Sequence, residues 1–196
     1  MSIKIWAKLA GGALAAAVTV GAFGPGEARA AFNVKDFSCT TDPFGVHVDV
    51  SGLGNTNVCV AGSVTLSLDC ACVGGGGNCT SDAKKATIPD SFQAGQSVEP
   101  KNGRVNTTFT LPVSISDGLC TEPQCGSGQD TKLIQWDTSP NSTPPGSPAT
   151  FSLCTTDAAG GQPCSCTGQP LLNTTTCGPT SNIVFPGKKG SCLGLF

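Results

Sequence analysis

The residues best suited to chemistry in this chain are twelve cysteines, a single histidine and thirteen acidic residues. Two groups of cysteines combine a Cys-x-Cys pair with a third cysteine downstream. The first group is Cys70, Cys72 and Cys79, and the second is Cys164, Cys166 and Cys177. Three thiolates could ligate a metal, but zinc sites prefer Cys-x2–4-Cys spacing, which lets both sulfurs reach one tetrahedral ion. The spacing therefore argues against a metal centre, and we expect neither a metal nor another cofactor.

All twelve cysteines are instead expected to form disulfides, because an even number of cysteines in an exported chain is typical of a disulfide framework. In an extended strand, Cys70 and Cys72 point to the same side about 7 Å apart, so each should bridge to another segment. Cys120 and Cys125 flank a turn at Pro123 and could pair with each other, whereas the remaining connectivity stays open. The predicted disulfide residues are Cys39, Cys59, Cys70, Cys72, Cys79, Cys120, Cys125, Cys154, Cys164, Cys166, Cys177 and Cys192.

His47 is the only histidine, so Ser-His-Asp or Cys-His catalysis would have to use it. Asp49 follows on the same face of a predicted strand, and the two residues form either a dyad or a solvent-facing polar pair. The chain has no Gly-x-Ser-x-Gly elbow and no His-Glu-x-x-His motif. The acidic residues are scattered and none has an aromatic setting. We therefore favour the polar pair, and we expect no catalytic residue and a non-enzymatic protein.

Residues 1–30 are expected to be a cleaved signal peptide. The segment has a lysine-containing start, an apolar run at 9–23 and the small-x-small sequence Ala-Arg-Ala at 28–30. Signal peptidase is therefore expected to cut between Ala30 and Ala31. The apolar run is shorter than the roughly 20 residues that span a bilayer. We expect a secreted protein, located outside the cell, at the cell surface or in the periplasm, without membrane insertion after cleavage.

The charge of the mature chain limits its partners. The leader contains three of the 11 basic residues and one of the 13 acidic residues, so the remainder has a net charge of 8 − 12 = −4. These charges are sparse and interspersed, and there is no basic patch. The composition therefore excludes nucleic acid as a ligand. A protein partner and self-association remain open.

Period-2 alternation is clearest over residues 104–116, where Val105 and Phe109 share one parity with other apolar residues, and polar residues occupy the other. This pattern predicts a strand with one face on a core. The Asn-Gly at 102–103 supplies the positive φ angles of a tight turn, so residues 96–99 are expected to pair back as a hairpin. We expect 104–116 to be a central strand.

The mature chain, 31–196, is expected to fold as one all-β domain, a disulfide-stapled immunoglobulin-like β-sandwich. No window shows a helical apolar stripe, and a closed barrel is the alternative. Residues 155–196 lose the alternation and are expected to be a loop-rich C-terminal extension. The other predicted strands are 44–50, 58–72, which an Ala-Gly at 61–62 could divide or bulge, 86–92 as an edge carrying Pro89, 131–137, 149–154 and 181–186.

Aromatic residues are scarce, since the chain has no tyrosine and a single tryptophan outside the leader. Aromatic side chains bury the most area per residue, so the predicted core is thin. A native disulfide is typically worth about 2–4 kcal/mol, and six of them would offset this weakness.

Several segments carry a resemblance to a known group of proteins. They are SGLGN at 51–55, the strand at 58–69, a Gly-rich loop, KNGRVNTTFTLPVS at 101–114 and ATFSLC at 149–154. In these segments the chain resembles small exported bacterial proteins with an immunoglobulin-like sandwich. The resemblance implies that fold and export, and it implies no biochemical activity. The many cysteines depart from the pattern of that group.

The sequence therefore predicts a secreted structural or binding protein, at the cell surface or in a matrix. The apolar segments 31–37 and 182–185 could add as strands to another chain, which would make the protein self-assembling. A secreted inhibitor or effector that presents the proline-rich loop 139–148 is the alternative. A secreted hydrolase using His47 or an acidic pair is a third hypothesis.

Overall fold

The computed structural model describes residues 32–196, so the predicted leader and the cut between Ala30 and Ala31 lie outside the described residues. The regular structure described is almost entirely antiparallel β, in two sheets, which confirms the predicted all-β class. The exceptions are two 3-10 turns, η1 (Asp117–Leu119) and η2 (Lys188–Gly190). Within residues 32–196, no helix is both long enough and apolar enough to cross a membrane.

The smaller sheet has three strands in the order β1-β2-β5. They are β1 (Asn33–Cys39), β2 (Gly45–Ser51) and β5 (Arg104–Thr110). Valines at alternate positions of β2 are fully buried, whereas His47 and Asp49 between them are partly exposed. The predicted alternation of this strand is confirmed.

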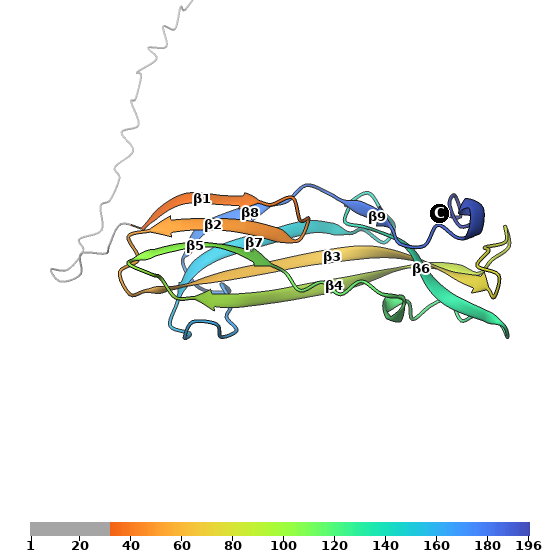
Figure 1. Ribbon diagram of the computed structural model, residues 1–196, viewed down its shortest axis with the longest axis horizontal. Coiled ribbons are helices and arrows are strands. Elements are labelled where there is room, and N and C mark those ends of the chain that lie inside the picture. The colour runs from red at the N-terminus through yellow and green to blue at the C-terminus, as the bar shows by residue number, and fades with distance from the viewer. Residues whose placement is uncertain (1–31) are drawn as a thin grey trace, which may run out of the picture.

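The larger sheet is built around one long strand, β3 (Asn57–Gly74). Along one side β3 pairs with β4 (Lys85–Val98), and along the other it pairs first with β7 (Ser147–Thr156) and then with β6 (Gln129–Asp137). β8 (Leu171–Thr176) extends the sheet beyond β7, and β9 (Ser181–Ile183) extends it beyond β6. Figure 1 shows β3 running through most of the length of the molecule.

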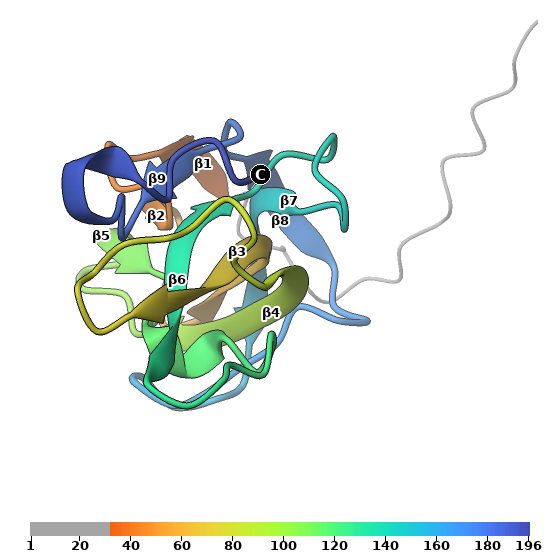
Figure 2. The ribbon, with the colours of Figure 1, turned by 90° about the vertical axis from the view of Figure 1, so that its right-hand side faces the viewer.

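The two sheets bury a shared core between them. β2 and β5 lie on one side of this core and β3, β4 and β7 on the other, as the end-on view in Figure 2 shows. On β3 the inward positions are apolar, and Val58, Val60, Leu66 and Leu68 are fully buried. Gly62 is the small residue in this series, since a Cβ there would lie 2.7 Å from the Phe151 ring. The strand is continuous at Ala61 and Gly62, and a shift in register with β7 falls between Ser63 and Thr65.

The prediction that residues 104–116 form a central strand is wrong. β5 ends at Thr110 and pairs only with β2, so it is an edge of the smaller sheet. The predicted turn is present, because Lys101 and Arg104 exchange backbone hydrogen bonds of 2.9 and 3.1 Å. The pairing with 96–99 does not continue, because β4 joins the larger sheet. The chain crosses between the sheets there, which lets both strands turn an apolar face toward the same core.

The predicted loop-rich extension, 155–196, contains two strands, β8 and β9. Its remaining segments cover the outer face of the larger sheet in two places. Near Cys59 and Ala61 the cover is the loop after β7, and near Ala71 and Val73 it is the C-terminal segment with Phe185 and Leu195. The edge positions predicted for β4 and β9 are confirmed.

The described parts of the segments 31–37 and 182–185 belong to this fold. Residues 33–37 belong to β1, which pairs with β2. Residues 182 and 183 belong to β9, and the N–H groups of Val184 and Phe185 both bond the Ile134 carbonyl. β1 and β9 each pair on one side only and lie at the edges of their sheets, so they are strands of this fold with one open side. Their pairing with another chain stays a prediction.

Candidate functional site: two adjacent disulfides beside a neutral cavity

The structure pairs all twelve cysteines, which confirms the predicted disulfide framework. The bridges are Cys39–Cys177, Cys59–Cys164, Cys70–Cys120, Cys72–Cys125, Cys79–Cys192 and Cys154–Cys166. Each of the two predicted cysteine groups is divided among three different bridges. Each sulfur of these groups is therefore bonded to a cysteine outside its own group, and it is not a thiolate that could ligate a metal.

Cys70 and Cys72 bridge to other segments, as predicted, but local pairing of Cys120 with Cys125 is wrong. Cys120 bonds to Cys70, and Cys125 bonds to Cys72. The segment that follows β5 runs past the end of β3, so that each of its cysteines meets one cysteine of the strand. Both strand cysteines are fully or almost fully buried.

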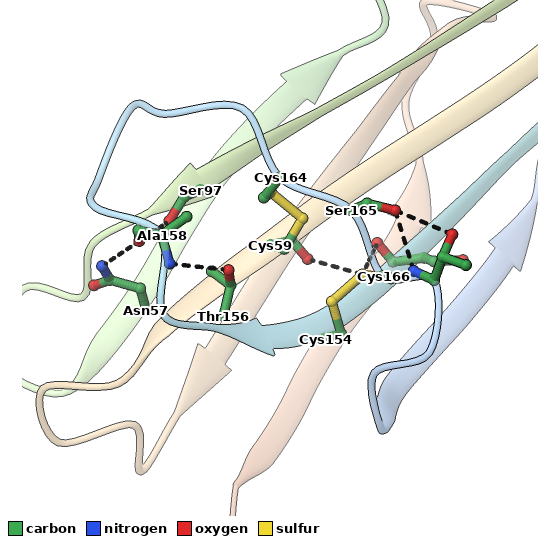
Figure 3. The surroundings of a disulfide bond; sticks show 11 residues. Asn57, Cys59, Ser97, Cys154, Thr156, Ala158, Cys164, Ser165 and Cys166 are labelled. Carbon is green, nitrogen blue, oxygen red and sulfur yellow. Dashed lines mark hydrogen bonds between the residues drawn. A yellow bond between two sulfur atoms is a disulfide. The ribbon is translucent and has the colours of Figure 1, made fainter.

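Two of the six bridges lie side by side on the outer face of the larger sheet (Figure 3). Cys59 on β3 and Cys154 on β7 are direct cross-strand partners. Each bonds to a cysteine of the loop after β7, Cys59 to Cys164 and Cys154 to Cys166. The Sγ atoms of Cys59, Cys154 and Cys166 all lie within 4.8 Å of one another, although Cys59 belongs to the other bridge.

The loop that carries Cys164 and Cys166, residues 157–170, is also held by hydrogen bonds to the ends of β3 and β4. The Ala158 carbonyl accepts from Asn57 Nδ2 at 2.8 Å and from Ser97 Oγ at 2.8 Å (Figure 3). The Ser97 N–H donates to the Gln162 carbonyl at 2.9 Å, and the Cys164 N–H donates to the Gly95 carbonyl at 3.2 Å.

Gly95 is required by this arrangement. A Cβ at that position would lie 2.3 Å from the Cys164 carbonyl oxygen, so no larger residue fits beneath the loop. The loop thus lies directly on the β4 backbone. It occupies the outward hydrogen-bonding groups of residues 95–97, which would otherwise form an open sheet edge.

Beside the two bridges the outer face is hollowed into an open cavity of about 610 Å³. Its floor is formed by small residues of β3, β4 and β7, among them Ala61, Ser63 and Ser152, and its wall is the loop segment 164–167. None of the lining residues is charged, and the wall includes Cys164 and Cys166. The cavity can therefore admit a small neutral or weakly charged molecule, but it offers no general base and no paired carboxylates.

His47 and Asp49 do not form a dyad. The Asp49 carboxylate is occupied by Arg104, which donates from Nε to Oδ1 at 2.8 Å and from Nη2 to Oδ2 at 2.6 Å. This hydrogen bonding, supported by the charge of Arg104, lowers the pKa of Asp49. His47 lies instead near Asp36 on β1, with 3.9 Å between Nε2 and Oδ2. The dyad fails because the bidentate arginine on the neighbouring strand is a stronger partner for the carboxylate.

Sequence reasoning missed the pairing of Cys59 with Cys154, because it depends on a register between strands far apart in the chain. One local signal was available. The outward positions of β3 are polar in its middle, at Ser63, Thr65 and Asp69, but Cys59 and Ala61 near one end are small and apolar. A switch of this kind indicates that another segment covers the outer face there.

Comparison of the chain with models of known protein families, with curated proteins and with solved structures finds no match.

Proposed function

We propose that the protein is exported and acts as a non-enzymatic structural or binding component outside the cell or at its surface. The observation that carries this proposal is the disulfide framework. Six bridges tie together both sheets, the connection between β5 and β6, the 157–170 loop and the C-terminal segment. Such frameworks form and persist in oxidising compartments and are rare in the cytosol.

Cell fractionation tests the export part of the proposal. The full chain, produced with a C-terminal tag, is expected outside the cytoplasm with Ala31 as its first residue. Its cysteines should resist alkylation until a reductant is added. A matched variant, Ala30→Asp, should retain the leader, because signal peptidase needs a small residue at that position. A cytoplasmic wild-type chain that starts at Met1 and alkylates without reduction would contradict the proposal.

The non-enzymatic part rests on how the candidate catalytic residues are used. Asp49 is bound by Arg104. Within residues 32–196, the one ion pair found for His47 is with Asp36, which is partly exposed. We expect His47→Ala and His47→Gln to leave both folding and function intact, since surface changes usually cost under about 0.5 kcal/mol. If a measured hydrolytic activity disappeared in both variants while the fold survived, the protein would have to be an enzyme.

The inhibitor hypothesis is the second candidate, because the 139–148 loop is held in one conformation by its own hydrogen bonds. The Ser139 carbonyl accepts from Ser142 Oγ at 2.5 Å and from the Gly146 N–H at 3.0 Å, and the Ser139 N–H donates to Asp137 Oδ1 at 2.6 Å. A rigid exposed loop binds with little loss of conformational entropy. A stoichiometric protease complex that is lost when 140–145 is replaced by a Gly-Ser linker would favour this candidate over a structural role.

A further inference from the structure

We propose that the two adjacent bridges form a thiol–disulfide exchange site. A small external thiol would move the covalent link from the 157–170 loop to a new bridge between Cys59 and Cys154. This inference goes beyond the proposed function and does not depend on it. It rests on the distances between sulfurs, on the strand register and on the cavity beside the loop.

The register holds the two strand cysteines together without help from the loop. On either side of Cys59 and Cys154, Val58 faces Thr155 and Val60 faces Leu153 in the antiparallel ladder. The ladder is thus independent of the bridges to Cys164 and Cys166. Within residues 32–196, no other set of three cysteine sulfurs lies as close together. Holding two reactants at such a distance gives an intramolecular reaction a high effective concentration.

Burial decides which sulfur an external thiol meets first. Cys59 and Cys154 are completely buried and Cys166 is 8% exposed, whereas Cys164 is partly exposed and lines the cavity wall. Attack on Cys164 therefore expels Cys59 as the leaving thiolate. Cys59 is also the residue whose sulfur already lies next to the second bridge.

The exchange then balances in three steps. The external thiolate bonds to Cys164 Sγ, and the electron pair of the broken bond stays on Cys59 Sγ. The Cys59 thiolate attacks Cys154 Sγ, which forms the Cys59–Cys154 bond and releases Cys166 as a thiolate. Cys166 attacks Cys164 and expels the external thiolate, which leaves a Cys164–Cys166 bond. No net oxidation or reduction occurs, and the thiol acts as a catalyst.

The product differs from the starting state in what is tied to the sheet. Cys59–Cys154 joins two strands that are already paired, so the 157–170 loop loses both of its covalent links to the sheet. Only its hydrogen bonds to residues such as Gly95 and Ser97 then keep it on β4. Exchange would therefore loosen the cover over this edge.

Peptide mapping tests the proposal on the folded wild-type protein. The protein is incubated with 2-mercaptoethanol, quenched in acid and digested with pepsin at low pH, which stops further exchange. We expect a peptide linked through Cys59 and Cys154 to appear with time, while peptides containing Cys39–Cys177 and Cys79–Cys192 stay unchanged. Failure of the Cys59–Cys154 peptide to appear while Cys59–Cys164 is cleaved would overturn the proposal. So would loss of Cys39–Cys177 or Cys79–Cys192 before these two bridges react.

Two serine variants separate the exchange step from the entry of the thiol. Cys164→Ser leaves a thiol on Cys59, and we expect Cys59–Cys154 to form without added thiol, with a free thiol on Cys166. Cys177→Ser is the matched control, since it leaves a thiol on Cys39 that has no second bridge within the same distance. This control should keep its other five native bridges. A Cys164→Ser protein with its free thiol on Cys59 and an intact Cys154–Cys166 bridge would overturn the proposal.

Hydrogen exchange measures the consequence for the loop. After 2-mercaptoethanol treatment, the Ser97 and Cys164 amides, which bond across the loop–sheet contact, should exchange at least several-fold faster. Amides of β3 that pair with β7 should keep their protection. Unchanged protection at Ser97 and Cys164 in a sample that contains the Cys59–Cys154 bridge would show that the loop is not released.

Discussion

Gly62 is the residue that lets the ring of Phe151 lie against β3. Gly62→Ala would place a Cβ 2.7 Å from two ring carbons of Phe151, a fully buried side chain. Because the surrounding core is closely packed, we expect the free energy of unfolding of this variant to be about 1–3 kcal/mol lower than that of the wild type. Urea denaturation measures the change. Gly75→Ala is the matched control, since a Cβ there meets no atom within 4 Å. Equal stabilities of the two variants would contradict the packing argument.

The ion pair between Asp49 and Arg104 makes a pH-dependent contribution to stability. The hydrogen bond from Arg104 lowers the pKa of Asp49 from its ordinary value of 3.8. A carboxyl with a lowered folded-state pKa adds stability above the unfolded-state pKa, and the contribution is lost as the pH falls through the folded-state pKa. We expect Asp49→Asn to lower Tm slightly at pH 7 and to match the wild type near pH 2.

The control for this measurement is Asp157→Asn, at an exposed residue outside the ion pairs found within residues 32–196. Its Tm difference from the wild type should not depend on pH in the same way. A Tm difference for Asp49→Asn that grows as the pH falls from 5 to 2 would contradict the assigned sign.

At the scale of elements, the free edge of β4 is protected where the loop does not cover it. Gly95 and Ser97 direct their backbone groups away from β3, toward the loop, so Pro89 and Ser91 share this outward direction. Pro89 has no N–H group to offer, and the N–H of Ser91 bonds its neighbour Asp90 at 2.9 Å. Two successive outward donors are therefore absent or occupied, which is how natural edge strands avoid pairing with other chains.

Removing this protection should promote association. We expect the double variant Pro89→Thr and Asp90→Ala to form more dimers or larger species than the wild type does at the same concentration. Sedimentation velocity over a concentration series measures the difference. Pro145→Thr combined with Asp157→Ala is the control, because it changes the same residue types at exposed positions outside the strands. A double variant at 89 and 90 with unchanged association would show that these residues do not protect the edge.

The strands that the sequence predicted share a clear alternation, as in β2 and in the first half of β3. β1 and β8 could not be predicted in this way, because Phe37 is the only one of their residues that is buried. The edge position of β5 and the pairing of Cys59 with Cys154 depend on which sheet each strand joins. That choice is made by contacts between distant segments, and no local pattern contains it.

At the scale of the whole molecule, the bridges should decide whether the protein is folded at all. Reduction is expected to unfold it, because the loss of one native bridge typically costs about 2–5 kcal/mol in a small secreted domain. Trp136 is an internal reporter, since it is buried with its ring centre 5.4 Å from that of Phe44. Its fluorescence should shift to the red on reduction and stay unchanged with a chelator. A chelator-induced shift would instead indicate a structural metal.

The Cys39–Cys177 bridge has a mechanical consequence. When residues 32 and 196 are pulled apart, the shortest covalent path runs from Cys39 to Cys177, so residues 40–176 cannot be drawn out along the line of force. The Cys79–Cys192 bridge also passes load into the connection between β3 and β4. Only the segments 32–39 and 177–196 can be drawn out, to a contour length of at most roughly 100 Å, against roughly 550 Å for the reduced chain. Single-molecule pulling should therefore find a short, stiff tether that lengthens several-fold once a reductant is present. A protein of this build sets a covalent limit on how far its two ends can be pulled apart.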